Sequence, residues 1–157
     1  MQSAAAALEA SALGEWMRGG GWSYAAVNVA HLFGLVLLVG PILLLDLRLL
    51  GFGRQFSAQD VSRALTPFAA TGLLIALLSG IALFSADATV LVGNRLMQLK
   101  LLAIALGLAN VALFHALWAR RLPDWDRACP RAARASALLS IGLWLAVPIA
   151  GRLIAYV

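Results

Sequence analysis

The chain has 157 residues, of which 62% are hydrophobic and only 12% are charged, and its mean hydropathy is +0.90. This composition excludes an ordinary water-soluble domain and indicates an integral membrane protein with one domain, residues 1–157. The net charge of +5 does not indicate a nucleic-acid partner, because the basic residues stand at the ends of apolar segments and not among aromatic residues on a polar surface.

The N-terminal segment Ser3–Met17 is rich in helix-forming residues and places several apolar side chains on one face. This pattern predicts a short helix lying on the membrane surface, and the alternative is a frayed, alanine-rich terminus. The first basic residue is Arg18, so the N-terminus lacks the basic start of a cleavable signal. We therefore expect the first spanning helix to direct insertion.

Four apolar segments are long enough to cross a bilayer, since a span needs about 20 residues and must satisfy its backbone as a helix. Pro41 and Pro148 are possible kinks, and Pro67 is acceptable in the first turn of the second span. The pattern predicts an all-α, four-helix bundle in the bilayer. The expected spans are about 24–50, 66–84, 96–117 and 135–156.

Three of these spans carry small residues at four-residue spacing, which lets another helix approach closely. A compact bundle with short connections would leave part of these ridges facing lipid, so the sequence predicts a homo-oligomer. The ridges are Ala26, Ala30 and Gly34 in the first span, Gly72, Ala76 and Gly80 in the second, and Gly142, Ala146 and Ala150 in the fourth.

The basic residues are distributed unequally between the two ends of the spans. Because cytoplasmic loops carry the excess of arginine and lysine, the connections after the first and third spans should be cytoplasmic and both termini should be outside. One end holds Arg48, Arg54, Arg63, Arg120, Arg121, Arg127, Arg131 and Arg134, and the other end holds Arg18, Arg95, Lys100 and Arg152.

The only two histidines, His31 and His115, both fall within predicted spans. An imidazole in a membrane bundle is well suited to bind the iron of haem b, and the alternative is a histidine that only hydrogen-bonds across helices. His31 lies seven residues past Tyr24 and His115 lies 20 past Arg95. The difference of 13 residues, roughly 20 Å along a helix, predicts two separate sites and not one iron held by both.

Other polar residues at each depth are candidate partners of these histidines. Met97 is a possible second iron ligand beside His31, while Lys100 and Arg152 could pair with haem propionates. A five-coordinate iron, or the same histidine of a second chain, stays an alternative. The other polar residues expected at the membrane depth of His31 are Asn28, Asp87 and Gln98. Those expected at the depth of His115 are Asp46, Arg48, Trp118, Arg120 and Arg121.

These residues favour a haem-b-binding protein with an electron-transfer role and a redox partner of unknown identity. Two alternatives stay open: a transport or channel subunit with a polar path along Asn28, His31, Asp46 and Arg48, and a structural protein without catalysis. Copper binding through His31, Met97 and Met17 is weaker, because three methionines make no Met-rich motif. The sequence has no recognisable catalytic motif, and the single Cys129 excludes an intrachain disulfide.

The segments HLFGLVLLVGPILLLDLRLLG and QLKLLAIALGLANVALFH resemble a family of small four-helix bacterial inner-membrane proteins of unknown function. More distantly, they are similar to the copper-resistance protein D-like and protoporphyrinogen-oxidase-like membrane families. This resemblance implies a bacterial inner-membrane location, and it matches His31 and Lys100 to an early histidine and a later lysine. In the protoporphyrinogen-oxidase-like families a second histidine, associated with haem b, stands two places before that lysine. Gln98 occupies that position here.

Overall fold

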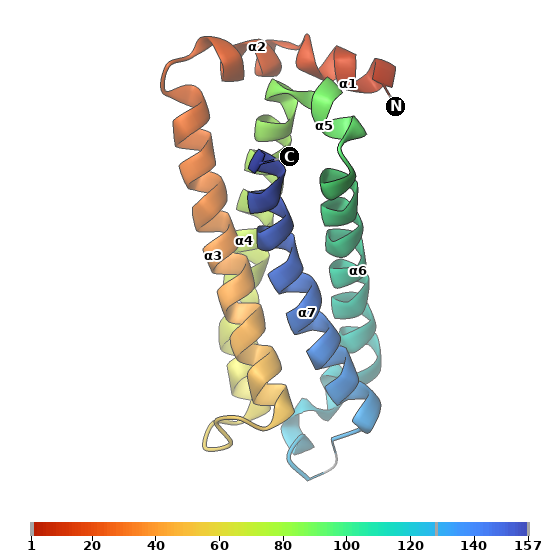
Figure 1. Cartoon of the computed structure of the whole chain (residues 1–157). Coiled ribbons are helices and arrows are strands. Elements are labelled where there is room, and N and C mark those ends of the chain that lie inside the picture. Colours follow the sequence, from red (N-terminus) through yellow and green to blue (C-terminus); the bar gives the residue numbers. More distant parts are fainter. Residues whose placement is uncertain (1, 128, 157) are drawn as a thin grey trace.

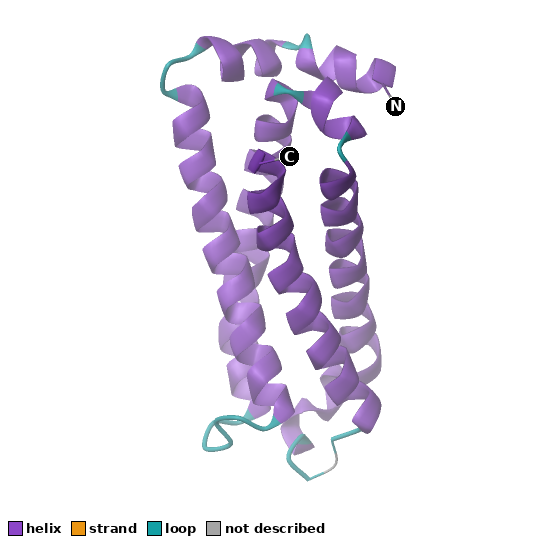
Figure 2. Ribbon diagram, in the orientation of Figure 1, coloured by secondary structure: helices purple, strands orange, loops and turns teal. Residues whose placement is uncertain are grey.

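The computed structural model describes residues 2–127 and 129–156, and this part of the chain contains helices and no strand. Four long helices stand side by side (Figures 1 and 2). They are α3 (Ser23–Leu50), α4 (Ala58–Ala86), α6 (Arg95–Trp118) and α7 (Arg131–Leu153). Each is long and apolar enough to cross a membrane, which confirms the all-helical class and the four apolar spans.

Short helices occupy the two ends of this bundle. At the end that holds both termini, here called the upper end, α1 (Gln2–Glu9) and α2 (Ala12–Gly19) run across the bundle beside α5 (Ala88–Gly93) (Figure 1). The 3₁₀ helix η2 (Ile154–Tyr156), which follows α7 at the C-terminus, also lies at the upper end. At the opposite, lower end the 3₁₀ helix η1 (Ala119–Asp124) precedes α7.

The single N-terminal helix expected over Ser3–Met17 is two helices in the structure. Ser11 separates them, because its hydroxyl donates to the Leu8 carbonyl at 2.6 Å and accepts from the Gly14 amide at 3.4 Å. A serine side chain that bonds to the backbone in this way ends one helix and caps the next.

Helix α4 begins at Ala58, eight residues before the expected Thr66. Ser57 caps it by accepting a hydrogen bond from the Asp60 amide at 3.0 Å, and Asp60 places a negative charge in the first turn. Pro67 therefore lies inside α4, and its expected place in the first turn is wrong. The helix continues through it on an exposed face, where the carbonyl freed by the missing N–H is not enclosed by other helices.

Helices α3 and α4 approach each other closely through small residues of the first and second ridges. A Cβ atom at Gly34 would lie 2.7 Å from the Ala76 amide nitrogen, and one at Gly72 would lie 2.8 Å from the Gly34 carbonyl oxygen and would overlap the backbone of Leu38. These glycines are required because the two backbones are in contact there. Gly142 of the third ridge, in contrast, has no neighbour within 4 Å among the described residues.

The four long helices pack in the order α4, α3, α7, α6. Helix α3 contacts α4 and α7, and α6 contacts α7, but among the described residues the backbones of α4 and α6 do not pack along their length. We call the line between these two helices the α4–α6 seam. Large apolar side chains cover the outside of the bundle, including Phe33, Val36 and Phe68, which are 65%, 69% and 55% exposed. Such a surface suits a lipid environment.

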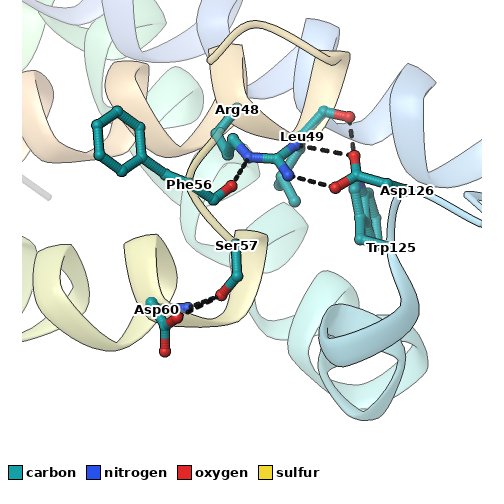
Figure 3. A network of polar contacts seen from close by, with 7 residues as sticks. All are labelled: Arg48, Leu49, Phe56, Ser57, Asp60, Trp125 and Asp126. Carbon is teal, nitrogen blue, oxygen red and sulfur yellow. Dashed lines mark hydrogen bonds and ion pairs between the residues drawn. The ribbon is translucent and has the colours of Figure 1, made fainter. Parts of the chain in front are cut away.

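A polar network closes the lower end of the bundle (Figure 3). The Arg48 guanidinium, only 3% exposed, donates to both carboxylate oxygens of Asp126, at 3.1 and 2.5 Å, and to the Phe56 carbonyl at 2.6 Å. The Trp125 indole donates to the Leu49 carbonyl at 2.9 Å. Arg48 therefore joins α3 to the loop that precedes α4, through Phe56, and to the loop that precedes α7, through Asp126. The planar guanidinium can donate one hydrogen bond to each oxygen of a carboxylate.

We expect acid to weaken this network. The hydrogen bonds from Arg48 hold the pKa of Asp126 below its ordinary value of 3.8, so the pair stabilises the fold above that pH and the effect is lost as the pH falls through the lowered pKa. Asp126→Asn should lower the melting temperature at pH 7 by a few degrees and should lose less stability than the wild type between pH 5 and pH 3. Thermal unfolding in detergent measures both.

Asp124→Asn is the matched control, because Asp124 forms only an exposed ion pair with Arg127 at 3.6 Å. Such pairs contribute about 0–1 kcal/mol, so this variant should melt close to the wild type. Equal losses in the two variants would show that the Arg48–Asp126 pair does not stabilise the fold.

Candidate functional site

A cavity of about 290 Å³, here called the upper cavity, lies between the four long helices in the upper half of the bundle. His31 of α3 and Met97 and Lys100 of α6 line it, so three of the five site residues predicted from the sequence come together. The rest of the wall is apolar and includes Leu35, Phe84, Ile104 and Val147. The cavity is thus an apolar space with an imidazole, a thioether and an ammonium group at its edge.

A serine on α4 contacts the imidazole of His31. The Ser79 hydroxyl donates its only proton to the Ile75 carbonyl at 2.5 Å, and it lies 3.0 Å from His31 Nδ1. When the hydroxyl donates to the Ile75 carbonyl, Ser79 accepts from His31, and in that tautomer Nδ1 bears the hydrogen and Nε2 keeps its lone pair. The ring also lies against Gly80, where a Cβ atom would be 3.3 Å from Cε1. This arrangement holds a half-buried imidazole between α3 and α4, and the contact with Ser79 is made by Nδ1.

Lys100 brings a cation to the same cavity without a carboxylate beside it. Its side chain packs over α7, where a Cβ atom at Gly151 would lie 3.3 Å from Nζ. No acidic side chain lines the upper cavity, and neither ion pair among the described residues includes Lys100. A cation held at this depth is costly without an opposite charge, so its surroundings favour an anionic group of a ligand.

The two N-terminal helices cover the upper end. The Glu9 carboxylate accepts hydrogen bonds from the Thr89 amide and hydroxyl at 2.8 and 2.7 Å, and these bonds hold the pKa of Glu9 below its ordinary value of 4.5. Arg18 donates to the Ala86 and Glu9 carbonyls at 3.1 and 2.8 Å. Leu8, between these anchors, reaches the wall of the upper cavity. Helix α1 therefore closes part of the upper cavity, and Arg18 of α2 is bonded to the end of α4 beside it.

A second cavity of about 200 Å³, here called the lower cavity, contains the other histidine. His115 is exposed at its edge and donates from Nδ1 to the Val111 carbonyl of its own helix at 2.9 Å. Asp46 and the hydrogen-bonded pair Asn110 and Ser136 line the same space. The two histidines thus face different cavities, in agreement with the separation in depth expected from the sequence.

Several predicted residues lie outside both cavities. Arg152 is exposed, bonds to the Tyr156 hydroxyl at 2.6 Å and lies over that ring with Cζ 5.0 Å from its centroid. Asn28 is exposed on α3, and Arg48 belongs to the network at the lower end. The expected contribution of Arg152 to the outer-level site is therefore not supported by its position.

Sequence reasoning missed two residues of the site: Ser79, which contacts His31, and Trp144, which lines both cavities. Ser79 is a polar residue next to Gly80 in an apolar span, which could have indicated a partner for His31. Trp144 is 1% exposed and lines both cavities, but an aromatic residue in a span carries no signal of this kind.

The described residues contain no group of three or more histidine, cysteine, aspartate or glutamate side chains placed to hold a metal ion. The chain matches no protein-family model, and no curated protein or solved structure is similar enough to it to be identified as a relative.

Proposed function

We propose that this protein binds haem b in the upper cavity and transfers electrons within a membrane. The observation that carries the proposal is the position of His31, whose Nδ1 is bonded to Ser79 and whose ring lines the same cavity as Met97 and Lys100. Imidazole and thioether are ordinary axial ligands of haem iron, and an ammonium group can pair with a propionate.

The imidazole of His31 and the thioether of Met97 fit haem in their chemistry, but the cavity is small for a porphyrin. A volume of about 290 Å³ is near the lower limit of small-molecule pockets, roughly 300 Å³. A bound porphyrin would therefore extend beyond this volume. Bound haem supplies an iron that gains and loses single electrons. Ser79 would orient His31, Nε2 of His31 would be available to the iron, and Lys100 would pair with an anionic substituent.

Purified protein from cells supplied with a haem precursor should show a Soret band and one haem per chain. With Met97 as the second ligand, electron paramagnetic resonance should show low-spin iron, and Met97→Leu should convert it to high-spin iron. Met17→Leu is the matched control, because Met17 is buried against Ala82 and Ala86 and does not line the cavity. Protein of normal fold without a Soret band would contradict the proposal.

If the iron of Met97→Leu stays low-spin, the second ligand is not the thioether, and His31 of a second chain becomes the strongest candidate. Mass determination in detergent then tests the predicted homo-oligomer. Within the chain, Gly34, Gly72 and Ala76 are used by the α3–α4 contact, whereas Gly142 and Ala146 of the third ridge are exposed. The third ridge is thus the better candidate for contact with another chain.

The alternative polar path has less support. His31 lines the upper cavity and Asp46 the lower one, while Asn28 is exposed and Arg48 is paired with Asp126. These positions do not form one continuous line of polar groups.

We further propose that the protein lies in a bacterial inner membrane with its lower end in the cytoplasm. The arginine-rich connections after α3 and α6 lie at that end, and α1 and α2 would lie along the outer surface (Figure 1).

Labelling of single cysteines in intact cells tests this orientation. In a Cys129→Ser background, Gly21→Cys at the upper end should react with a membrane-impermeant thiol reagent, and Gln55→Cys at the lower end should react only after lysis. Both positions are exposed, so access to the reagent differs only by the side of the membrane. Labelling of Gln55→Cys before lysis would show that the lower end lies outside the cytoplasm.

A further inference from the structure

The lower cavity contains polar groups that the proposed haem site does not use. It extends between all four long helices, and most of its wall is apolar, including Ile42, Leu45, Leu73 and Phe114. Its volume is about 200 Å³. For comparison, an apolar cavity of roughly 150 Å³ binds benzene, so this space is of the size of one substituted ring.

Asp46 presents an incompletely satisfied carboxyl group at the wall of this cavity. Its side chain is only 6% exposed, Ser140 of α7 lies beside it, and Oδ2 has no hydrogen-bond partner among the described residues. A buried polar atom without a partner costs about 1–3 kcal/mol. Oδ2 is enclosed by protein, but rotation about Cβ–Cγ exchanges the two oxygens, and in either protonation state the carboxyl group has an oxygen that accepts a hydrogen bond.

Trp144 is a second unsatisfied group on the same wall. Its side chain is 1% exposed, and its indole N–H donates to no acceptor in the described part of the chain. Asn110 and Ser136, in contrast, satisfy each other through bonds of 2.8 and 3.1 Å across α6 and α7. The indole N–H of Trp144 lies near Gly107 of α6, where a Cβ atom would be 3.5 Å from Nε1, so Asp46 is the group that offers a free acceptor to this cavity.

We infer that the lower cavity binds a single-ring phenol that arrives from the lipid through the α4–α6 seam, with its hydroxyl donating to Asp46. The apolar wall and the rings of Phe114 and Trp144 suit an aromatic ring. The unpaired acceptor oxygen of Asp46 favours a ligand with an O–H donor, and the acyl chain of a lipid has no such group. Metal binding is less well matched, because the wall offers one carboxylate among apolar side chains.

The test uses 4-fluorophenol as the ligand and 4-fluoroanisole as its counterpart without the O–H group, both observed by fluorine NMR with the full-length protein in nanodiscs. Empty nanodiscs measure partition into lipid alone. We expect saturable binding of 4-fluorophenol and at least tenfold weaker binding of 4-fluoroanisole. Asp46→Leu should reduce the preference for the phenol to less than twofold, while Asp46→Asn, which keeps an acceptor oxygen, should retain it.

Two further variants separate loss of the site from loss of the fold. Asn28→Leu makes the same kind of change at an exposed position of α3 and should bind 4-fluorophenol like the wild type. Ala69→Phe fills the cavity from α4 without changing a polar group and should abolish binding. Equal binding of the two ligands, no saturable binding, or unchanged preference in Asp46→Leu with normal melting would overturn the inference. Each outcome is independent of haem content.

Discussion

His31→Ala is expected to remove bound haem almost completely, whereas His115→Ala should retain it. Ser79 lies 3.0 Å from Nδ1 of His31, so Nε2 is the nitrogen proposed to bind iron, and His31 shares its cavity with Met97 and Lys100. His115 is exposed and lines a smaller cavity without a thioether or a cation. Haem per chain and the Soret absorbance of the purified variants measure the difference.

Two additional measurements show whether the effect is ligation. Added imidazole should restore a Soret band in His31→Ala, because the substitution leaves room for the free base. Ser79→Ala keeps the ligand but removes the group that orients it, and loss of such a partner typically weakens metal affinity by 10–100-fold. Equal haem retention in His31→Ala and His115→Ala would refute haem binding at the upper cavity.

The second large effect is expected at the contact of α3 and α4. Gly72→Ala places a methyl group 2.8 Å from the Gly34 carbonyl oxygen and against the backbone of Leu38, so the two helices must separate. Forcing atoms into a packed contact costs about 1–3 kcal/mol, and we expect the free energy of unfolding to fall by this amount. Equilibrium unfolding in mixed micelles provides the measurement.

Gly142→Ala is the matched control, since it makes the same change in a long helix where no atom lies within 4 Å. Alanine favours a helix by about 1 kcal/mol over glycine, so this variant should be as stable as the wild type or more stable. If Gly72→Ala were equally stable, the close approach of α3 and α4 would not contribute to folding.

The sequence by itself determined the class of the protein and the number of long helices. An apolar stretch of about 20 residues must satisfy its backbone within the segment, so each helix can be predicted locally from hydropathy. The same reasoning predicted that His31 and His115 lie at different depths, because a helix has a constant rise per residue.

The ends of the helices could not be predicted from hydropathy, because they depend on local capping contacts. The start of α4 depends on the bond between Ser57 and Asp60, and the division of the N-terminal segment depends on Ser11. Both serines stand in polar stretches where hydropathy does not mark the end of a helix. The expected position of Pro67 was wrong for this reason.

Only the tertiary structure decided which polar residues meet. Lys100 and Arg152 belong to the same level in the sequence, yet Lys100 lines the upper cavity and Arg152 bonds to Tyr156. Arg48 finds its partner in Asp126, which is far along the chain, and Ser79 meets His31 from another helix. Hydropathy gives the depth of a residue but not the rotation of its helix. That rotation follows from close contacts such as Gly34 and Gly72, which bring α3 and α4 together.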